Sequence, residues 1–128
     1  ISGYQSGWYY VPSRSGEGIN FNVARNGDRL FISVAWFTYS MGEQMWLIGS
    51  VDINEGDEMA TVELYRTSGT GFGNAFNADD VLLDLWGTLT VSVPDCGLLF
   101  VEWDGGQAFG TGELLMEQLV NVAGLECE

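Results

Sequence analysis

Apolar and polar residues alternate along most of this chain, and this alternation constrains the fold more than any other feature of the sequence. Ile19, Phe21 and Val23 are separated by single residues, and the same spacing recurs between Leu89 and Val93. A period of two places alternate side chains on opposite faces of a β-strand, so each segment is typical of a half-buried strand. We expect eight strands, over residues 7–11, 17–25, 29–39, 43–53, 58–67, 82–93, 97–104 and 108–120.

Short turn signals separate most of these segments, among them Asn26-Gly27-Asp28 and Asp104-Gly105-Gly106. Consecutive hairpins of this kind make an antiparallel meander. Eight strands in a meander close naturally into a small up-and-down barrel, which has no exposed edge. A two-sheet β-sandwich of the same strands is the alternative. A chain of 128 residues predicts a single domain, residues 1–128.

The charge of the chain excludes several classes of function. Eighteen acidic residues face four arginines, with no lysine and no histidine, for a net charge of −14. Nucleic acid and anionic membrane surfaces need basic patches, so neither is an expected partner. Without histidine or lysine there is no Ser-His-Asp triad, imidazole metal site or Schiff base. No apolar run of 18 residues is present, so we expect no insertion into a membrane.

Carboxylates therefore carry whatever chemistry remains. Hydrolysis by two acidic side chains is one form of it, and Glu17, Glu102 and Asp104 are among many candidates. A calcium site built from oxygen ligands is the other. The segment from Asp52 to Glu58 breaks the order of an EF-hand loop and is better interpreted as a hairpin turn. Asp79 and Asp80, beside Asn77, are the candidate calcium ligands. We expect no other cofactor.

The connection from residue 68 to residue 81 is unusually long for a compact domain. Loops of this length are usually functional or mobile. It contains two phenylalanines, Phe72 and Phe76. These rings are expected either to plug one end of the barrel or to form a lid over a ligand.

Two predicted strands, 29–39 and 43–53, are apolar on both faces. A barrel strand facing water keeps one polar side, so we expect this region to be covered by a ligand, by a partner or by a second copy of the chain. The candidate residues for this interaction surface or ligand site are Leu30, Ile32, Val34, Trp36, Trp46 and Ile48.

Three segments together resemble a known family. They are Ser6-Gly-Trp-Tyr-Tyr-Val-Pro-Ser-Arg-Ser-Gly-Glu-Gly-Ile-Asn-Phe, Leu30-Phe-Ile-Ser-Val-Ala-Trp-Phe-Thr-Tyr39 and Met45-Trp-Leu-Ile-Gly49. The chain resembles secreted bacterial domains with a Trp-x-x-Pro-x-x-Ser-Gly-x-Gly opening, a Leu-Phe-x-x-x-Trp-Phe-Thr-Tyr strand and a Trp-Leu strand. The resemblance implies a small meandering barrel and a secreted, extracellular or periplasmic location. It implies no activity, because none is established for that family.

Two glycines of the opening segment resemble the spacing of a phosphate-binding loop. Gly16 and Gly18 precede a predicted strand rather than a helix, so no helix N-terminus is available to hold an anion. We assign them a backbone role instead, a sharp turn and a close approach between strands.

Cys96 and Cys127 are expected to form a disulfide, because an exported chain with an even number of cysteines usually pairs them. Closing a loop of this length stabilises a fold by roughly 3 to 4 kcal/mol in the chain-entropy model. Mass spectrometry after alkylation without reduction should find no labelled thiol. Two labelled cysteines would contradict both the disulfide and the oxidising location.

These observations lead to one preferred function and two alternatives. The preferred function is a secreted or cell-surface bacterial module that does not catalyse, and that self-assembles or binds another extracellular protein through strands 29–39 and 43–53. The first alternative is a lipocalin-like or avidin-like carrier of a small apolar ligand or glycan. The second is a carboxylate-dependent glycoside hydrolase.

Overall fold

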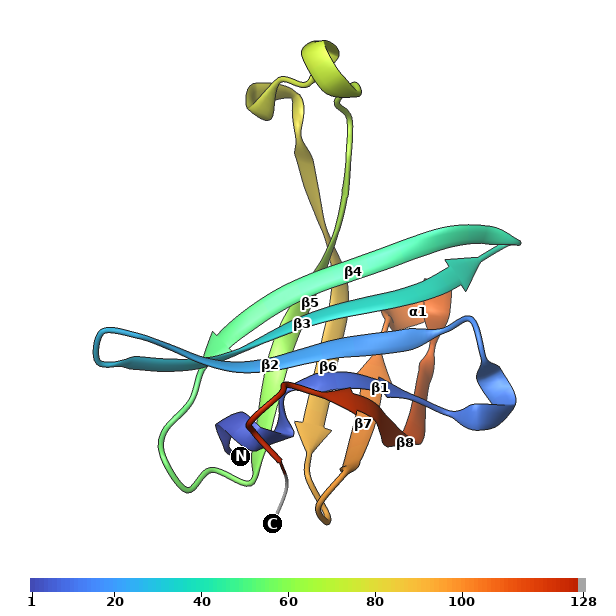
Figure 1. The fold of residues 1–128 in the computed structure, drawn as a ribbon. Helices are drawn as coiled ribbons and strands as arrows, with labels where there is room; N and C mark the ends of the chain where they lie inside the picture. Colours follow the sequence, from blue (N-terminus) through green and yellow to red (C-terminus); the bar gives the residue numbers. More distant parts are fainter. Residues whose placement is uncertain (127–128) are drawn as a thin grey trace.

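The computed structural model describes residues 1–126 and consists of eight antiparallel strands around a closed barrel (Figure 1). The strands are β1 (Gly7–Tyr10), β2 (Gly18–Asn26), β3 (Arg29–Ser40), β4 (Glu43–Asp52), β5 (Met59–Ser68), β6 (Leu82–Ser92), β7 (Leu98–Asp104) and β8 (Thr111–Asn121). The helical segments are single turns: η1 (Gly3–Gln5), η2 (Pro12–Arg14), η3 (Gly73–Ala75), η4 (Ala78–Asp80) and α1 (Gly106–Phe109).

The predicted meander is confirmed, and the barrel rather than the sandwich is the fold. Each strand pairs with the next along the chain, and β1 pairs with β8 to close the ring. The eight expected strands differ from the observed ones by a few residues at their ends. The largest difference is at the start of β8, where α1 occupies residues that the alternation assigned to the strand.

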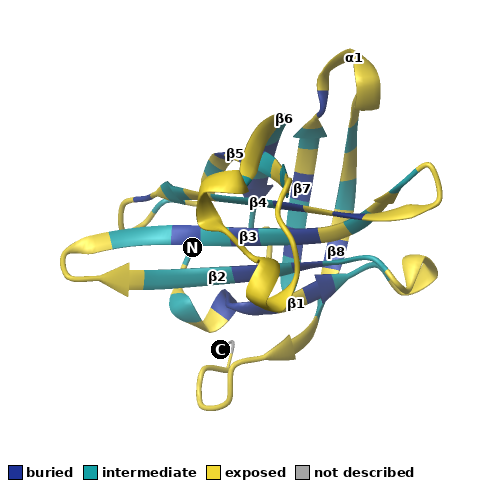
Figure 2. Ribbon diagram, turned by 90° about the horizontal axis from the view of Figure 1, so that it is seen from above, coloured by how far each residue is buried: buried dark blue, intermediate teal, exposed yellow. Residues whose placement is uncertain are grey.

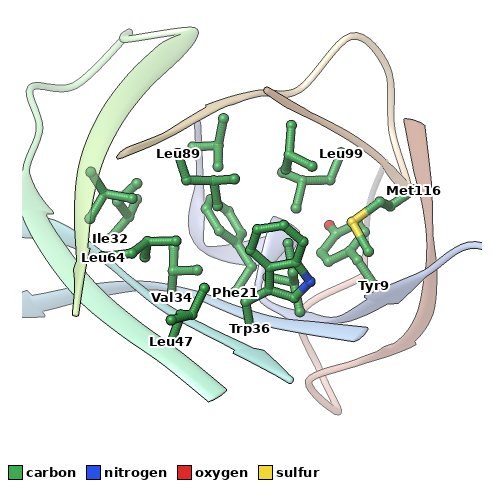
Figure 3. Packing of buried hydrophobic residues seen from close by; sticks show 14 of the residues in the cluster. Tyr9, Phe21, Ile32, Val34, Trp36, Leu47, Leu64, Leu89, Leu99 and Met116 are labelled. Carbon is green, nitrogen blue, oxygen red and sulfur yellow. The ribbon is translucent and has the colours of Figure 1, made fainter. Parts of the chain in front are cut away.

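The interior of the barrel is filled by apolar side chains (Figure 3). Alternate residues of every strand point inward, as the period of two requires. The buried cluster comprises Tyr9, Ile19, Phe21, Ile32, Val34, Trp36, Met45, Leu47, Ile53, Val62, Leu64, Leu89, Val91, Leu99, Val101 and Met116. A ligand of a lipocalin-like carrier would have to displace this core, so the outer surface offers the better candidate sites.

The N-terminal turn packs against one end of this core. The hydroxyl of Tyr9 donates a hydrogen bond of 2.6 Å to the carbonyl oxygen of Gln5, in η1. Burial raises the pKa of Tyr9 to about 12 because the phenolate would be poorly solvated inside the barrel. Tyr9 therefore stays a neutral hydrogen-bond donor over the ordinary pH range.

The hairpin of β5 and β6 extends beyond the barrel and forms a projecting arm, defined here as residues 65–85 (Figure 1). The arm begins at an irregularity in the pairing: Leu64 pairs with Gly87 and Tyr65 pairs with Leu85, which leaves Trp86 as an extra residue. Such a bulge bends the strand that carries it and increases its twist. The hairpin thereby leaves the curvature of the barrel, with η3 and η4 at its tip.

Candidate functional site

Three of the residues predicted to form the interaction surface lie in the barrel interior instead. Ile32, Val34 and Trp36 are at most 4% exposed and belong to the core cluster. Their assignment to a surface is wrong, because β3 is apolar on both faces and the period of two alone does not say which face points inward. The outward face of β3 carries Phe37 and Tyr39.

The other predicted surface residues differ in their surroundings. Leu30 is half-buried and packs against the core. Trp46 is 49% exposed, and Ile48, two residues further along β4, is half-buried on the same outer face. Only the β4 part of the predicted surface is therefore open to a partner.

Four aromatic side chains gather on the outside of the sheet where Trp46 lies. We call Trp8, Phe37, Tyr39 and Trp46 the aromatic platform; their exposed fractions are 39, 41, 51 and 49% respectively. The rings of Trp8 and Phe37 have centroids 5.5 Å apart, and those of Phe37 and Trp46 are 6.4 Å apart and nearly parallel, at 13°. The platform thus crosses the sheet from β1 to β4 as a row of contacting rings.

A glycine makes this row continuous. Gly18 of β2 pairs with Phe37, and Phe37 pairs with Trp46. A β-carbon on Gly18 would lie 3.2 Å from the carbonyl oxygen of Tyr9 and 4.0 Å from the indole of Trp8. The bare backbone lets the rings of Trp8 and Phe37 meet across β2, which confirms the predicted close approach at Gly18. Gly16 has a φ of +107°, so the predicted sharp turn is also present.

A polar network borders the platform beside η2. Arg14 Nε donates to Glu17 Oε1 at 2.8 Å, and Thr38 Oγ1 donates to Glu17 Oε2. The hydroxyl of Tyr39 donates to the carbonyl oxygen of Gly16 at 3.2 Å. The hydrogen bond to Glu17 raises the pKa of Arg14 above its usual value, so the guanidinium stays charged. These contacts fix the end of β3 against the turn before β2.

The arm carries a group of exposed apolar side chains. In Figure 2 the arm points toward the viewer and its tip is coloured as exposed. Five large apolar side chains of the arm are 57–98% exposed: Phe72, Phe76, Leu82, Leu83 and Leu85. Phe72 is 98% exposed, so it neither plugs a barrel end nor acts as a lid, and this prediction is wrong for that ring. The loop, with η3 and η4, lies at the tip of the arm (Figure 1).

Two hollows separate the arm from the outer faces of β3 and β4. One has a volume of about 420 Å³ and is lined by Trp46, Ile48, residues 67–70, Phe76 and Val81. The other, of similar volume, is lined by residues 33–35, residues 48–50, Tyr65 and Leu83. We call the two together the arm groove. Its walls bring the predicted residues Trp46, Ile48 and Phe76 to one place.

The carboxylates do not form a metal centre in the part of the chain that is described. Asp79 and Asp80 lie in η4 and are exposed, and the Asp79 amide donates to the side chain of Asn77. Across residues 1–126, no three histidine, cysteine or acidic side chains are grouped so that they could hold a metal ion. Glu102 and Asp104 are exposed on β7, whereas Glu17 is held by Arg14 and Thr38.

Comparison of the chain with protein-family models, curated proteins and solved structures gives no match. The resemblance to secreted bacterial barrel domains therefore stays a prediction. In residues 1–126, no helix has the length and apolar character needed to cross a membrane. The predicted disulfide also stays a prediction, because Cys127 lies outside the described residues.

Sequence reasoning missed most of the residues that make up these two surfaces. Trp8 and Phe37 were identifiable as apolar, but their position outside the barrel depends on which alternate set faces inward. The consecutive leucines Leu82 and Leu83 were a usable signal, because adjacent residues of a strand point to opposite faces. A core on one face of the sheet can therefore bury only one of these two leucines.

Proposed function

We propose that the protein is a secreted, non-catalytic module that binds a second copy of itself or another extracellular protein through the arm and the arm groove. The observation that carries this proposal is the exposure of five large apolar side chains on one projecting hairpin. Burial of such a side chain contributes roughly 1.5–3 kcal/mol, so covering several of them supplies a substantial driving force. Exposed apolar clusters of this kind mark interaction sites in soluble proteins.

The arm groove supports the same function. A protruding apolar element beside an apolar hollow is the arrangement in which interface anchors fill pockets on a partner. Phe72 supplies the protrusion, and Trp46, Ile48 and Phe76 supply walls of the hollow. Two copies would therefore offer each other both halves of the contact, as an isologous dimer requires.

Charge sets the conditions under which association is strongest. Each copy has a net charge of −14, and the arm holds three acidic residues against one arginine, Arg66. Repulsion between copies is screened by salt, and calcium bridges carboxylates, so self-association should strengthen with either. A basic partner would bind the arm best at low salt. The salt dependence distinguishes the two kinds of partner.

Removing the exposed apolar side chains of the arm should abolish association. We expect the wild-type protein to sediment as a dimer or larger species at high salt or with calcium, and the double variant Phe72→Ser, Leu83→Ser to remain a monomer. The matched control is Leu115→Ser, Leu119→Ser on β8, where the two leucines are 56 and 58% exposed. This control should associate like the wild type. Sedimentation velocity measures all three.

If the wild-type protein is a monomer under every condition, self-association is excluded, and another extracellular protein remains as the proposed partner. The wild-type protein should then capture a partner protein from the extracellular fluid of the source organism. The β8 control should capture the same partner, and the arm variant should not. Equal capture by both variants, or none by the wild type, would contradict the proposal.

A further inference from the structure

The aromatic platform differs from the rest of the protein surface because most of it lies in the one part of the chain that is nearly neutral. Residues 11–52 contain three arginines and four acidic residues, whereas the remaining sequence contains one arginine and fourteen acidic residues. All three of these arginines are paired: Arg14 with Glu17, Arg25 with Glu55 and Arg29 with Asp52. An acidic protein thus has one nearly neutral face.

The outward side chains between the rings and the ion pairs are small or uncharged. On β2 and β3 the outward residues beside the platform include Asn20, Asn22 and Ser33, and Asn22 pairs with Ser33 across the two strands. On β4 they include Gln44 and Ser50, which pair with Tyr39 and Ser33. Amides and hydroxyls of this kind donate and accept hydrogen bonds without carrying charge.

We propose that the aromatic platform is a binding site for an uncharged glycan chain. A pyranose ring has two apolar faces made of C–H groups and an edge of hydroxyl groups. Aromatic rings have an electron-rich face that attracts such C–H groups, and they lose little conformational entropy on binding. The contacting rings of Trp8, Phe37 and Trp46 supply consecutive stacking surfaces, and the neighbouring amides and hydroxyls supply partners for the sugar edge.

The rigidity of the platform favours this function. Three of its rings are held by contacts with one another, and Tyr39 is held by its hydrogen bond to Gly16. The strands beneath them are continuously paired from β2 to β4. A site already ordered before binding avoids the entropic cost of ordering side chains. Lack of charge favours a neutral ligand over a basic partner, which the acidic remainder of the surface would attract more strongly.

The test uses neutral hexasaccharides of β-linked glucose, xylose, mannose and N-acetylglucosamine, with hexagalacturonate as an anionic control. We expect at least one neutral hexasaccharide to bind in titration calorimetry and to change tryptophan fluorescence. Its Kd should be nearly independent of salt because no counterions are released. Phe37→Ala should raise that Kd at least about tenfold, since it removes the central ring of the row.

Two further variants separate binding from folding. Phe37→Tyr keeps the ring and should bind within a few-fold of the wild type, whereas the arm variant Phe72→Ser, Leu83→Ser should bind like the wild type. The proposal is overturned if none of the neutral hexasaccharides binds, if Phe37→Ala binds as tightly as the wild type, or if hexagalacturonate is preferred. A protein partner lost by the platform variant and kept by the arm variant would also overturn it. Trp46 borders both surfaces, but Phe37 lies outside the arm groove, and Phe72 and Leu83 lie outside the platform. The two sets of variants therefore distinguish failure of this proposal from failure of the proposed protein contact.

Discussion

Replacement of Trp36 by alanine is expected to lower the free energy of unfolding by about 3–5 kcal/mol. Trp36 is 4% exposed and lies in the core, where its ring contacts those of Trp86 and Trp103 at centroid distances of 5.9 and 5.5 Å. Alanine would remove these contacts and leave a cavity that a closed barrel is poorly able to collapse. Denaturant titration followed by circular dichroism measures the loss.

Trp46 provides a matched control for this substitution. It is a tryptophan on the neighbouring strand, but it is 49% exposed and its ring stacks on that of Phe37. Trp46→Ala should therefore cost only about 1 kcal/mol, the order of one aromatic contact. Equal losses for the two variants would mean that the inward and outward faces of β3 and β4 have been assigned wrongly. If Trp36→Ala left the free energy of unfolding unchanged, the result would contradict a filled barrel core.

The comparison of these two tryptophans shows what the sequence could predict. The period of two correctly predicted the number and order of the strands, because backbone geometry alone imposes that period. It did not predict that Trp36 points inward and Trp46 outward, because both alternate sets are apolar in β3 and in residues 45–48 of β4. Burial depends on the pairing of β3 with its neighbours, which brings residues distant in sequence to one side of the sheet.

The direction of the arm is a second feature that the sequence did not predict. The sequence identified the long connection, residues 68–81, as a functional candidate, but it left Phe72 and Phe76 either as a plug of one barrel end or as a lid over a ligand. The direction of the loop depends on the bulge at Trp86, opposite Leu64 and Tyr65, which bends the hairpin away from the barrel. No residue type marks that bulge unambiguously. The glycine motif was more informative, since both the turn at Gly16 and the close approach at Gly18 are observed.

Strands β4 and β5 share the fewest paired residues of any two neighbouring strands in the described barrel, and they approach closely at Gly49. The two strands are paired through only Leu47 with Arg66 and Ile48 with Tyr65 in the described residues. A β-carbon on Gly49 would lie 2.1 Å from the carbonyl oxygen of Glu63 and 3.0 Å from Val62 Cγ2. Because the nearer atom belongs to the backbone, a side-chain rotation does not relieve the clash. The strands would have to separate.

Gly49→Val is therefore expected to lower the free energy of unfolding by at least about 2 kcal/mol, although valine favours strands over glycine. Ser50→Val is the control, because Ser50 is exposed on the same strand and its replacement should change stability by no more than about 0.5 kcal/mol. Hydrogen exchange should locate the damage, with faster exchange in β4 and β5 than in β7 and β8. Since Ile48, Gly49 and Tyr65 also line the arm groove, separating β4 from β5 should weaken arm-dependent association as well. A stable Gly49→Val protein with unchanged exchange would show that β4 and β5 tolerate separation, and that the position of the arm does not depend on their contact.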